Sequence, residues 1–156
     1  MSADRTPRRA TADDAATVAH LLHDFNTEFA TPSPGVGVLT ARLRTLLAGD
    51  DTIALVAGNP AAAVALVTMR PNVWYAGRVA LLDEMYVVPA QRNHGIGSAV
   101  LKHLVAMAPA LDVDLIEINV DEGDVDAQRF YEHHGFMASE PGSTERSWYY
   151  FRELAD

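Results

Sequence analysis

Residues 86–98 read Tyr86-Val87-Val88-Pro89-Ala90-Gln91-Arg92-Asn93-His94-Gly95-Ile96-Gly97-Ser98, and they join an apolar strand to a glycine-rich, basic helix start. The first four N–H groups of a helix have no acceptor within the helix, and glycine lets a ligand approach the backbone closely. The helix dipole and the side chains of Arg92 and His94 add positive character at the same place. The segment therefore predicts a binding site for an anion such as a phosphate group.

Two common phosphate-binding patterns do not fit the spacing of these glycines. A dinucleotide-binding fingerprint needs a third glycine where Val100 stands, and a P-loop needs Gly-Lys-Ser/Thr, which is absent. Taken alone, Gly95 and Gly97 leave open a second interpretation, in which they only shape a turn into a helix.

The pattern Arg92-x-x-Gly95-x-Gly97 after Val-Val-Pro resembles motif A of the GNAT superfamily of acyl-CoA-dependent N-acyltransferases. Family members often have glycine after the arginine; here Asn93 takes that place, and asparagine tolerates a left-handed backbone better than other non-glycine residues. The resemblance implies that this segment binds the pyrophosphate and pantetheine parts of coenzyme A. The residues so assigned are Tyr86, Val87, Val88, Arg92, Asn93, His94, Gly95, Ile96, Gly97 and Ser98.

Residues 120–136 resemble GNAT motif B, usually written Asn-x-x-Ala followed by an aromatic pair, an acid and Gly-Phe. Asp124 stands where asparagine is usual, and a carboxylate cannot donate a hydrogen bond. A direct contact of Asp124 with the cofactor is therefore in doubt, and its simplest role is to cap a helix. Two motifs in the family's order, separated by a strand, predict membership of this superfamily.

Tyr131 is the first catalytic candidate. In the family, the corresponding tyrosine commonly lies beside the sulfur of acyl-CoA and serves as general acid. A phenol with a pKa near 10 stays protonated at neutral pH and can protonate a departing thiolate. The alternative is an aromatic residue that only packs.

Glu84 is the second catalytic candidate, as the base that takes a proton from the amine. Strand alternation places Asp83 and Glu84 on opposite faces, and burial would raise the pKa of a carboxyl group into a useful range. The alternative is a carboxylate at the sheet surface or in an ion pair. The resemblance also implies that a backbone N–H at Tyr86–Val88 polarises the thioester, and that this strand pairs with the pantetheine arm.

The helices and strands that the sequence predicts can be listed in chain order. Turn signals and periodicity predict a strand at 8–10, a helix capped by Thr11, a loop at 31–37, a helix ending at Gly49, strands at 52–57, 61–69 and 78–88, a helix to about 108, a strand at 115–120, a helix through His133, and two last strands, one from Phe136 and one at 147–154. In the first helix the apolar face consists of Val18, Leu21, Leu22, Phe25 and Phe29.

This order is that of the GNAT fold. We expect an α/β (α+β) chain with a mixed central sheet of about seven strands and four helices, forming one domain over 1–156. The strand at 147–154 is strongly apolar, and such an edge in this family is often completed by a second subunit, which predicts a homodimer.

Composition narrows the chemistry further. The chain has 156 residues and no cysteine, which excludes disulfides, thiolate metal sites and a cysteinyl acyl intermediate. The first eleven residues lack the apolar core of a secretory signal, and the turn at 58–60 interrupts the longest apolar stretch, so we expect a cytoplasmic protein without a membrane span. The histidines have no carboxylate spacing typical of zinc, and no metal is expected.

The formal net charge is −9, and residues 112–126 hold seven acidic side chains with no lysine or arginine. Nucleic acid is therefore not an expected partner. Two interpretations of the acidic segment stay open: a rim that attracts a cationic amine, or a solvated face.

The sequence thus predicts an N-acetyltransferase that moves an acetyl or other small acyl group from acetyl-CoA to a primary amine of a small molecule or peptide, by direct attack in a ternary complex. The alternative is a non-catalytic acyl-CoA-binding sensor or interaction module. The acceptor itself depends on loops that have no legible pattern.

Overall fold

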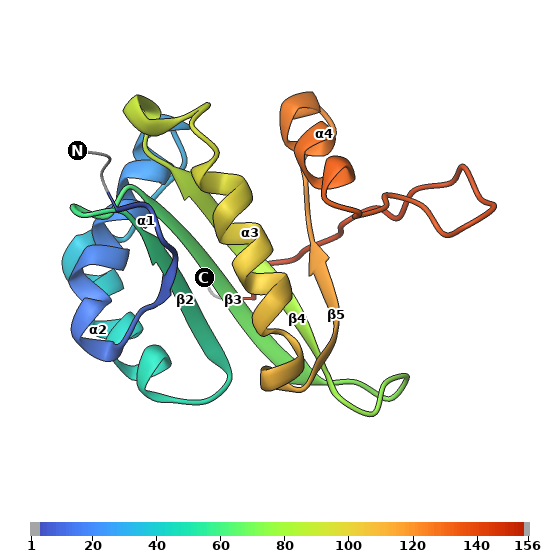
Figure 1. Cartoon of the computed structure of the whole chain (residues 1–156), viewed down its shortest axis with the longest axis horizontal. Helices are drawn as coiled ribbons and strands as arrows, with labels where there is room; N and C mark the ends of the chain where they lie inside the picture. The colour runs from blue at the N-terminus through green and yellow to red at the C-terminus, as the bar shows by residue number, and fades with distance from the viewer. Residues whose placement is uncertain (1–3, 155–156) are drawn as a thin grey trace. The chain divides into compact units, whose positions relative to one another are not determined.

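The structure, a computed structural model, describes residues 4–154. The chain divides into two compact units, Met1–Ile118 and Asn119–Asp156. Figure 1 shows the course of the chain.

The first unit contains a five-stranded sheet in the order β1-β2-β3-β4-β5. Its strands are β1 (Arg8–Arg9), β2 (Thr52–Ala57), β3 (Ala63–Pro71), β4 (Arg78–Val87) and β5 (Val113–Ile118). Strands β1 to β4 pair antiparallel, and β5 runs parallel to β4. The sheet is therefore mixed, as predicted.

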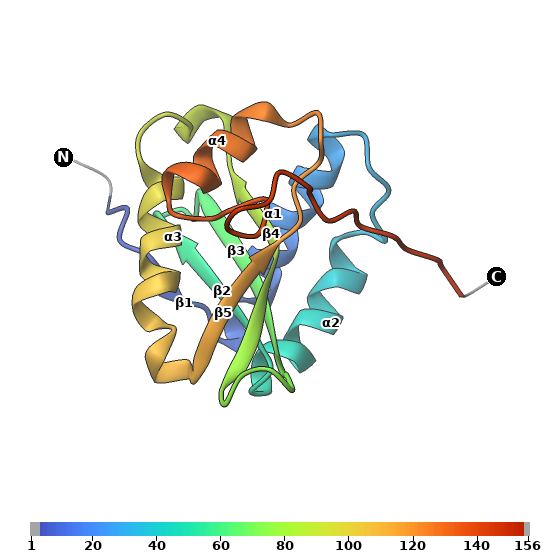
Figure 2. The same ribbon diagram turned by 90° about the vertical axis from the view of Figure 1, so that its right-hand side faces the viewer.

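Three α-helices cover the two faces of this sheet. Helices α1 (Ala15–Glu28) and α2 (Val36–Ala48) lie on one face, and α3 (Ile96–Met107) lies on the other, as Figure 2 shows. Short 3-10 turns precede α1 at Ala12–Asp14, precede α3 at Pro89–Gln91 and follow α3 at Pro109–Leu111. All six residues of β2 are buried, as expected for a strand with helices on both sides.

Within the first unit, the structure differs from the sequence prediction mainly around the connection between α1 and α2. Phe29 follows the last residue of α1 and is 58% exposed, so it does not belong to the apolar face of that helix. Val36 and Gly37 were expected in a loop but form the first turn of α2, which begins directly after Gly35 with its φ of 96°. The sequence predicted the next strand at 115–120, but β5 begins at Val113, where its pairing with β4 starts, and ends at Ile118.

The second unit contains α4 (Val125–His133) and an extended tail. The carboxylate of Asp124 accepts the N–H of Ala127 at 3.0 Å, which confirms the predicted helix cap. The two predicted last strands are wrong, because the described residues after α4 form only one isolated bridge, between Ser139 and Arg146. The apolar residues of the tail had high strand propensity, but a strand also needs a partner, and Trp148, Tyr150 and Phe151 are exposed.

Gly77, just before β4, is a site where we expect a large effect of a small substitution on stability. Its N–H donates to Asp114 Oδ2 at 2.7 Å, and a Cβ at this residue would lie 2.6 Å from the carbonyl oxygen of Asp112. Gly77→Ala should therefore lower the free energy of unfolding by about 1–3 kcal/mol, the usual cost of forcing an extra carbon into a packed site. Urea denaturation measures the change.

Gly37→Ala is the matched control, because a Cβ at Gly37 meets nothing within 4 Å in the middle of the first turn of α2. This variant should leave stability unchanged or raise it by up to about 1 kcal/mol, the difference in helix propensity. Equal effects of the two substitutions would contradict the predicted clash.

Candidate active site

The connection from β4 to α3 has the geometry of an anion-binding loop. Asn93 and Gly95 both have left-handed backbone conformations, with φ of 62° and 80°, so the expectation for Asn93 is confirmed. The first hydrogen bond of α3 runs from the N–H of Ala99 to the carbonyl oxygen of Gly95 at 3.0 Å. The amides of Ile96 and Gly97 precede this bond, and alternating left-handed residues turn successive N–H groups toward one side.

The surroundings of this loop leave room for a ligand. A Cβ at Gly95 would meet no atom within 4 Å, whereas Ile96 beside it is 2% exposed and anchors the helix start in the core. Gly97 is half-buried on the first turn of α3. The backbone N–H groups of this segment thus fit a diphosphate, whose oxygens accept several hydrogen bonds at once.

The guanidinium group of Arg92 contacts a carboxylate of the same chain. Its Nη2 lies 2.8 Å and 2.9 Å from the two carboxylate oxygens of Glu28, the last residue of α1. Its Nε donates to the carbonyl oxygen of Val87 at 3.0 Å. The positive charge that the sequence assigned to the phosphate is therefore paired with Glu28.

Tyr86 completes this group of contacts. Its hydroxyl donates to Glu28 Oε1 at 3.3 Å, its ring stacks on Phe25 with centroids 5.0 Å apart, and Arg92 lies over the ring at 5.6 Å. Burial, and next the charge of Glu28, raise the pKa of Tyr86. The phenol therefore stays protonated and keeps donating its hydrogen bond at physiological pH.

Strand β4 separates from β5 before it ends. The last parallel pair is Leu82 with Ile118, whereas the antiparallel pairing with β3 continues to Val87. In the part of the chain that the structure describes, residues 83–87 have no strand partner on the side of β5. That stretch of main chain can pair with an extended ligand.

Glu84 lies in this same stretch of β4. A bulge interrupts the pairing here, because Leu66 faces Glu84 and Val67 faces Leu82, which leaves Asp83 without a partner residue. Asp83 is exposed and accepts a hydrogen bond from the hydroxyl of Thr68, whereas Glu84 is half-buried. Burial, and next the charge of Asp83, raise the pKa of the Glu84 carboxyl group. Glu84 is thus a carboxylate whose environment favours taking up a proton.

Tyr131 belongs to the second unit, on α4. Only 8% of it is exposed, and its ring contacts Phe130 and Phe136 edge-on, with centroids 5.1 Å and 5.7 Å away. Burial, and next the charge of Asp124, raise the pKa of Tyr131 to about 12. Its hydroxyl is a proton donor over the whole physiological range.

The structure thus brings Glu84 and residues 86–98 together on the first unit, while Tyr131 stands on the second. Sequence reasoning missed Glu28. A signal was present, because Leu21, Phe25 and Glu28 follow helical spacing, so that Glu28 is a carboxylate at the end of an apolar helix face.

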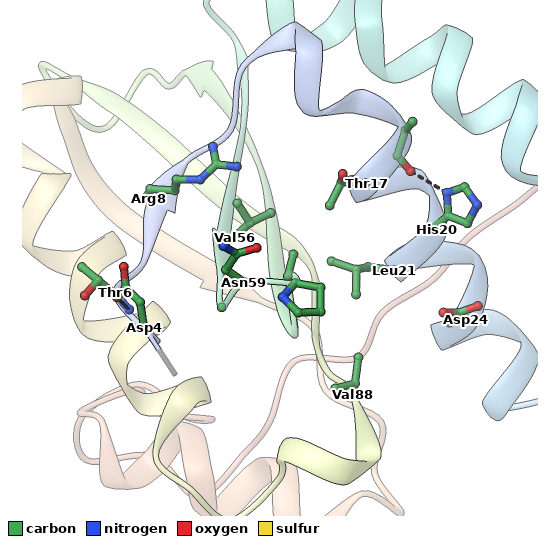
Figure 3. A pocket seen from close by; sticks show the side chains of 14 residues that line it. Asp4, Thr6, Arg8, Thr17, His20, Leu21, Asp24, Val56, Asn59 and Val88 are labelled. Carbon is green, nitrogen blue, oxygen red and sulfur yellow. Dashed lines mark hydrogen bonds between the residues drawn. The ribbon is translucent and has the colours of Figure 1, made fainter. Parts of the chain in front are cut away.

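A hollow of about 900 Å³ lies beside α1 and the turn between β2 and β3 (Figure 3). Of the residues assigned to the cofactor, only Val88 lines it. Two of its polar side chains already have partners within the chain: Arg8 pairs with Asp14 at 2.8 Å, and His20 Nδ1 lies 2.8 Å from the carbonyl oxygen of Ala16. The hollow is therefore adjacent to the candidate site and does not contain it.

Two acidic residues of the segment 112–126 have roles within the first unit. Asp114 accepts the N–H of Gly77, and Glu117 pairs with Arg70 at 3.6 Å. Among residues 4–154 no group of three or more His, Asp or Glu side chains is arranged to hold a metal ion. Over the same residues, no helix has the length and apolar character to cross a bilayer.

Comparison with known proteins agrees with this geometry. The sequence model of the acetyltransferase (GNAT) family matches residues 18–136. A solved structure described as a candidate acetyltransferase from Arthrobacter sp. FB24 is 54% identical, covers 96% of each chain and superposes with a TM-score of 0.90. No curated protein matches the chain significantly.

More distant structures share the architecture. A transcriptional regulator from Bacillus halodurans C-125 is 26% identical, with 92% of this chain and 99% of that chain covered and a TM-score of 0.75. An aminoglycoside acetyltransferase from an uncultured soil metagenomic sample, in complex with sisomicin, is 15% identical, with 96% of each chain covered and a TM-score of 0.78. At that identity the likeness concerns the fold alone.

Proposed function

The chain belongs to the acetyltransferase (GNAT) family, and we propose that it transfers an acetyl or other small acyl group from acyl-CoA to a primary amine by direct attack in a ternary complex. The observation that carries the proposal is the loop at 93–97, with its two left-handed residues Asn93 and Gly95 at the start of α3, within a chain matched by the family model over 18–136.

In this proposal the backbone amides of residues 93–97 hold the pyrophosphate of coenzyme A. The separated edge of β4 at 83–87 pairs with the pantetheine arm, which the end of the β4–β5 ladder at Leu82 supports. A backbone N–H at Tyr86–Val88 donates to the carbonyl oxygen of the thioester and stabilises the negative charge that develops there.

The proposed chemistry needs proton transfers at the amine nitrogen and at the departing sulfur. An ammonium group must lose a proton before its nitrogen can attack, and Glu84, with its raised pKa, accepts that proton directly or through water. The amine nitrogen then forms a bond to the acyl carbon, and the bond from that carbon to sulfur breaks. Tyr131 gives its phenolic proton to the departing thiolate, and its phenolate recovers a proton when the nitrogen of the product loses its second proton, directly or through water.

We propose that the acceptor is a primary amine, and that the acidic character of the chain favours a cationic one. Small polyamines, aminoglycosides, amino acid derivatives and peptide amines all satisfy that description. We also place the reaction in the cytoplasm, where acyl-CoA is available.

Isothermal calorimetry with acetyl-CoA, followed by a thiol-release assay across a panel of amines, tests the function. Micromolar binding together with acyl transfer to at least one amine is the expected result. Binding without transfer to any amine would favour the acyl-CoA sensor, and failure to bind any acyl-CoA would overturn the proposal.

Glu84→Gln should lower kcat by about a hundredfold, within the range typical of losing a general base. The wild-type rate should rise with pH as the carboxyl group ionises, and this limb of the profile should begin above the usual range of glutamate because the pKa is raised. The variant should lack that limb. The pH dependence of kcat with a fixed amine measures both effects.

The same substitution should raise stability at neutral pH. Because folding raises the pKa of Glu84, its ionised form is less favourable in the folded state, so its contribution to stability falls as pH rises through that pKa. Glu84→Gln should therefore unfold at a higher temperature than wild type at pH 7, and the difference should shrink in acid. Asp83→Asn, at the exposed neighbour, serves as the control and should retain the rise of kcat with pH, moved to lower pH because the charge of Asp83 is one cause of the raised pKa of Glu84. A Glu84→Gln variant with full activity and an unchanged pH profile would assign the base elsewhere.

A further inference from the structure

We propose that Glu28 is a positioning residue for the cofactor loop, which acts through Arg92 from the end of α1. The proposal rests on the assignment of this loop to acyl-CoA. It adds a residue 64 positions away along the chain from Arg92, on a helix that carries neither sequence motif.

The contacts of Arg92 connect three parts of the first unit. The guanidinium group reaches α1 through both oxygens of Glu28, β4 through the carbonyl oxygen of Val87, and the ring of Tyr86 through a cation–π contact. Arg92 directly precedes Asn93, the first left-handed residue of the loop. The side chain of Arg92 therefore fixes the backbone where the loop begins, and with it the direction of the N–H groups that follow.

Glu28 is the anionic member of this arrangement. Hydrogen bonds between a guanidinium group and a carboxylate are shorter and stronger than neutral ones, and here the single nitrogen Nη2 of Arg92 lies within 2.9 Å of both oxygens of Glu28. The side chains of Glu28 and Arg92 are 27% and 38% exposed, and the carboxylate also accepts the hydroxyl of Tyr86. These three contacts hold Glu28 itself in one place, so that it can restrain Arg92.

In this arrangement Arg92 orients the loop, and it does not bind the phosphate itself, which is the role that the sequence assigned to it. With Arg92 paired to Glu28, the phosphate groups are bound by backbone N–H groups whose directions are set before the ligand arrives, so less ordering is required on binding. If Arg92 instead bound the phosphate directly, Glu28 would compete with the ligand, and its removal would tighten binding. The two possibilities thus predict opposite changes in the affinity for coenzyme A when the charge of Glu28 is removed.

The test is calorimetric titration of coenzyme A into the full chain and its variants. Glu28→Gln should weaken binding about tenfold, the effect of losing one charge-assisted contact in a site of this kind. Glu28→Asp keeps the charge and should recover part of the affinity. Arg92→Met should weaken binding by a similar factor, and Glu28→Gln should add nothing in the Arg92→Met background, because Glu28 acts only through that side chain.

Asp14→Asn is the matched control, because Asp14 and Arg8 form a similar pair with N–O distances of 2.8 Å and 2.9 Å on another part of the same unit. This variant should lower the melting temperature and leave the affinity for coenzyme A unchanged. Unchanged or tighter binding by Glu28→Gln, or additive losses in the double variant, would overturn the role of Glu28. Failure of the wild-type chain to bind coenzyme A would instead overturn the proposed function.

Discussion

Gly97→Glu is expected to abolish coenzyme A binding. Gly97 lies on the first turn of α3, directly after the left-handed Gly95 and the buried Ile96, and under the proposed function the pyrophosphate binds at this helix start. A carboxylate there adds bulk and places a negative charge against another. Like charges about 4 Å apart near a protein surface repel by about 4 kcal/mol, which corresponds to a loss of affinity of roughly a thousandfold. Calorimetry should detect no binding at micromolar protein.

Ala106→Glu is the control for this substitution. Ala106 is an exposed residue of the same helix, so the same charge is added far from the helix start. That variant should bind coenzyme A like wild type, and both variants should keep wild-type helical content by circular dichroism. Binding by Gly97→Glu within about tenfold of wild type would show that the phosphate groups lie elsewhere, since charge repulsion at contact distance exceeds that factor.

Tyr131→Phe should lower kcat by about a thousandfold, in the middle of the range for removing a general acid, while the Kd for acetyl-CoA stays within about twofold. Phenylalanine preserves the ring and its edge-on contacts with Phe130 and Phe136, so the substitution removes little more than the hydroxyl group. Steady-state kinetics and calorimetry on the same preparation separate the two effects.

The pH dependence gives an independent check on Tyr131. Because its pKa is raised to about 12, the phenol remains protonated over the usual assay range, and the wild-type profile should show no loss of activity on the alkaline side from this group below about pH 11. If Tyr131→Phe kept full turnover while a pre-steady-state experiment showed that chemistry limits the rate, the general-acid role would be wrong.

Local patterns in the sequence predicted much of this structure. The bounds of β2 were predicted without error, because a turn signal follows a short apolar run. The helix cap at Asp124 and the left-handed Asn93 were also predicted, since both depend on the chemistry of a single residue and its immediate neighbours.

The features that were missed depend on partners distant in sequence. Glu28 and Arg92 meet only because α1 packs across the end of β4, and nothing near either residue indicates the other. The bulge at Asp83 arises from a register shift between β3 and β4 that alternation along one strand does not reveal. The tail after α4 had the composition of a strand, but composition does not indicate whether a neighbouring edge is available.

The edge of β4 beyond Leu82 also bears on the lifetime of the protein in the cell. A sheet whose hydrogen bonding is completed by a cosubstrate is more stable when that cosubstrate is plentiful, because a ligand that binds only the folded chain shifts the folding equilibrium. At a free concentration of 100 times Kd the gain is about 2.7 kcal/mol. Under the proposed function, starvation for acyl-CoA would therefore expose the chain to proteases and lower its abundance before any change in its synthesis.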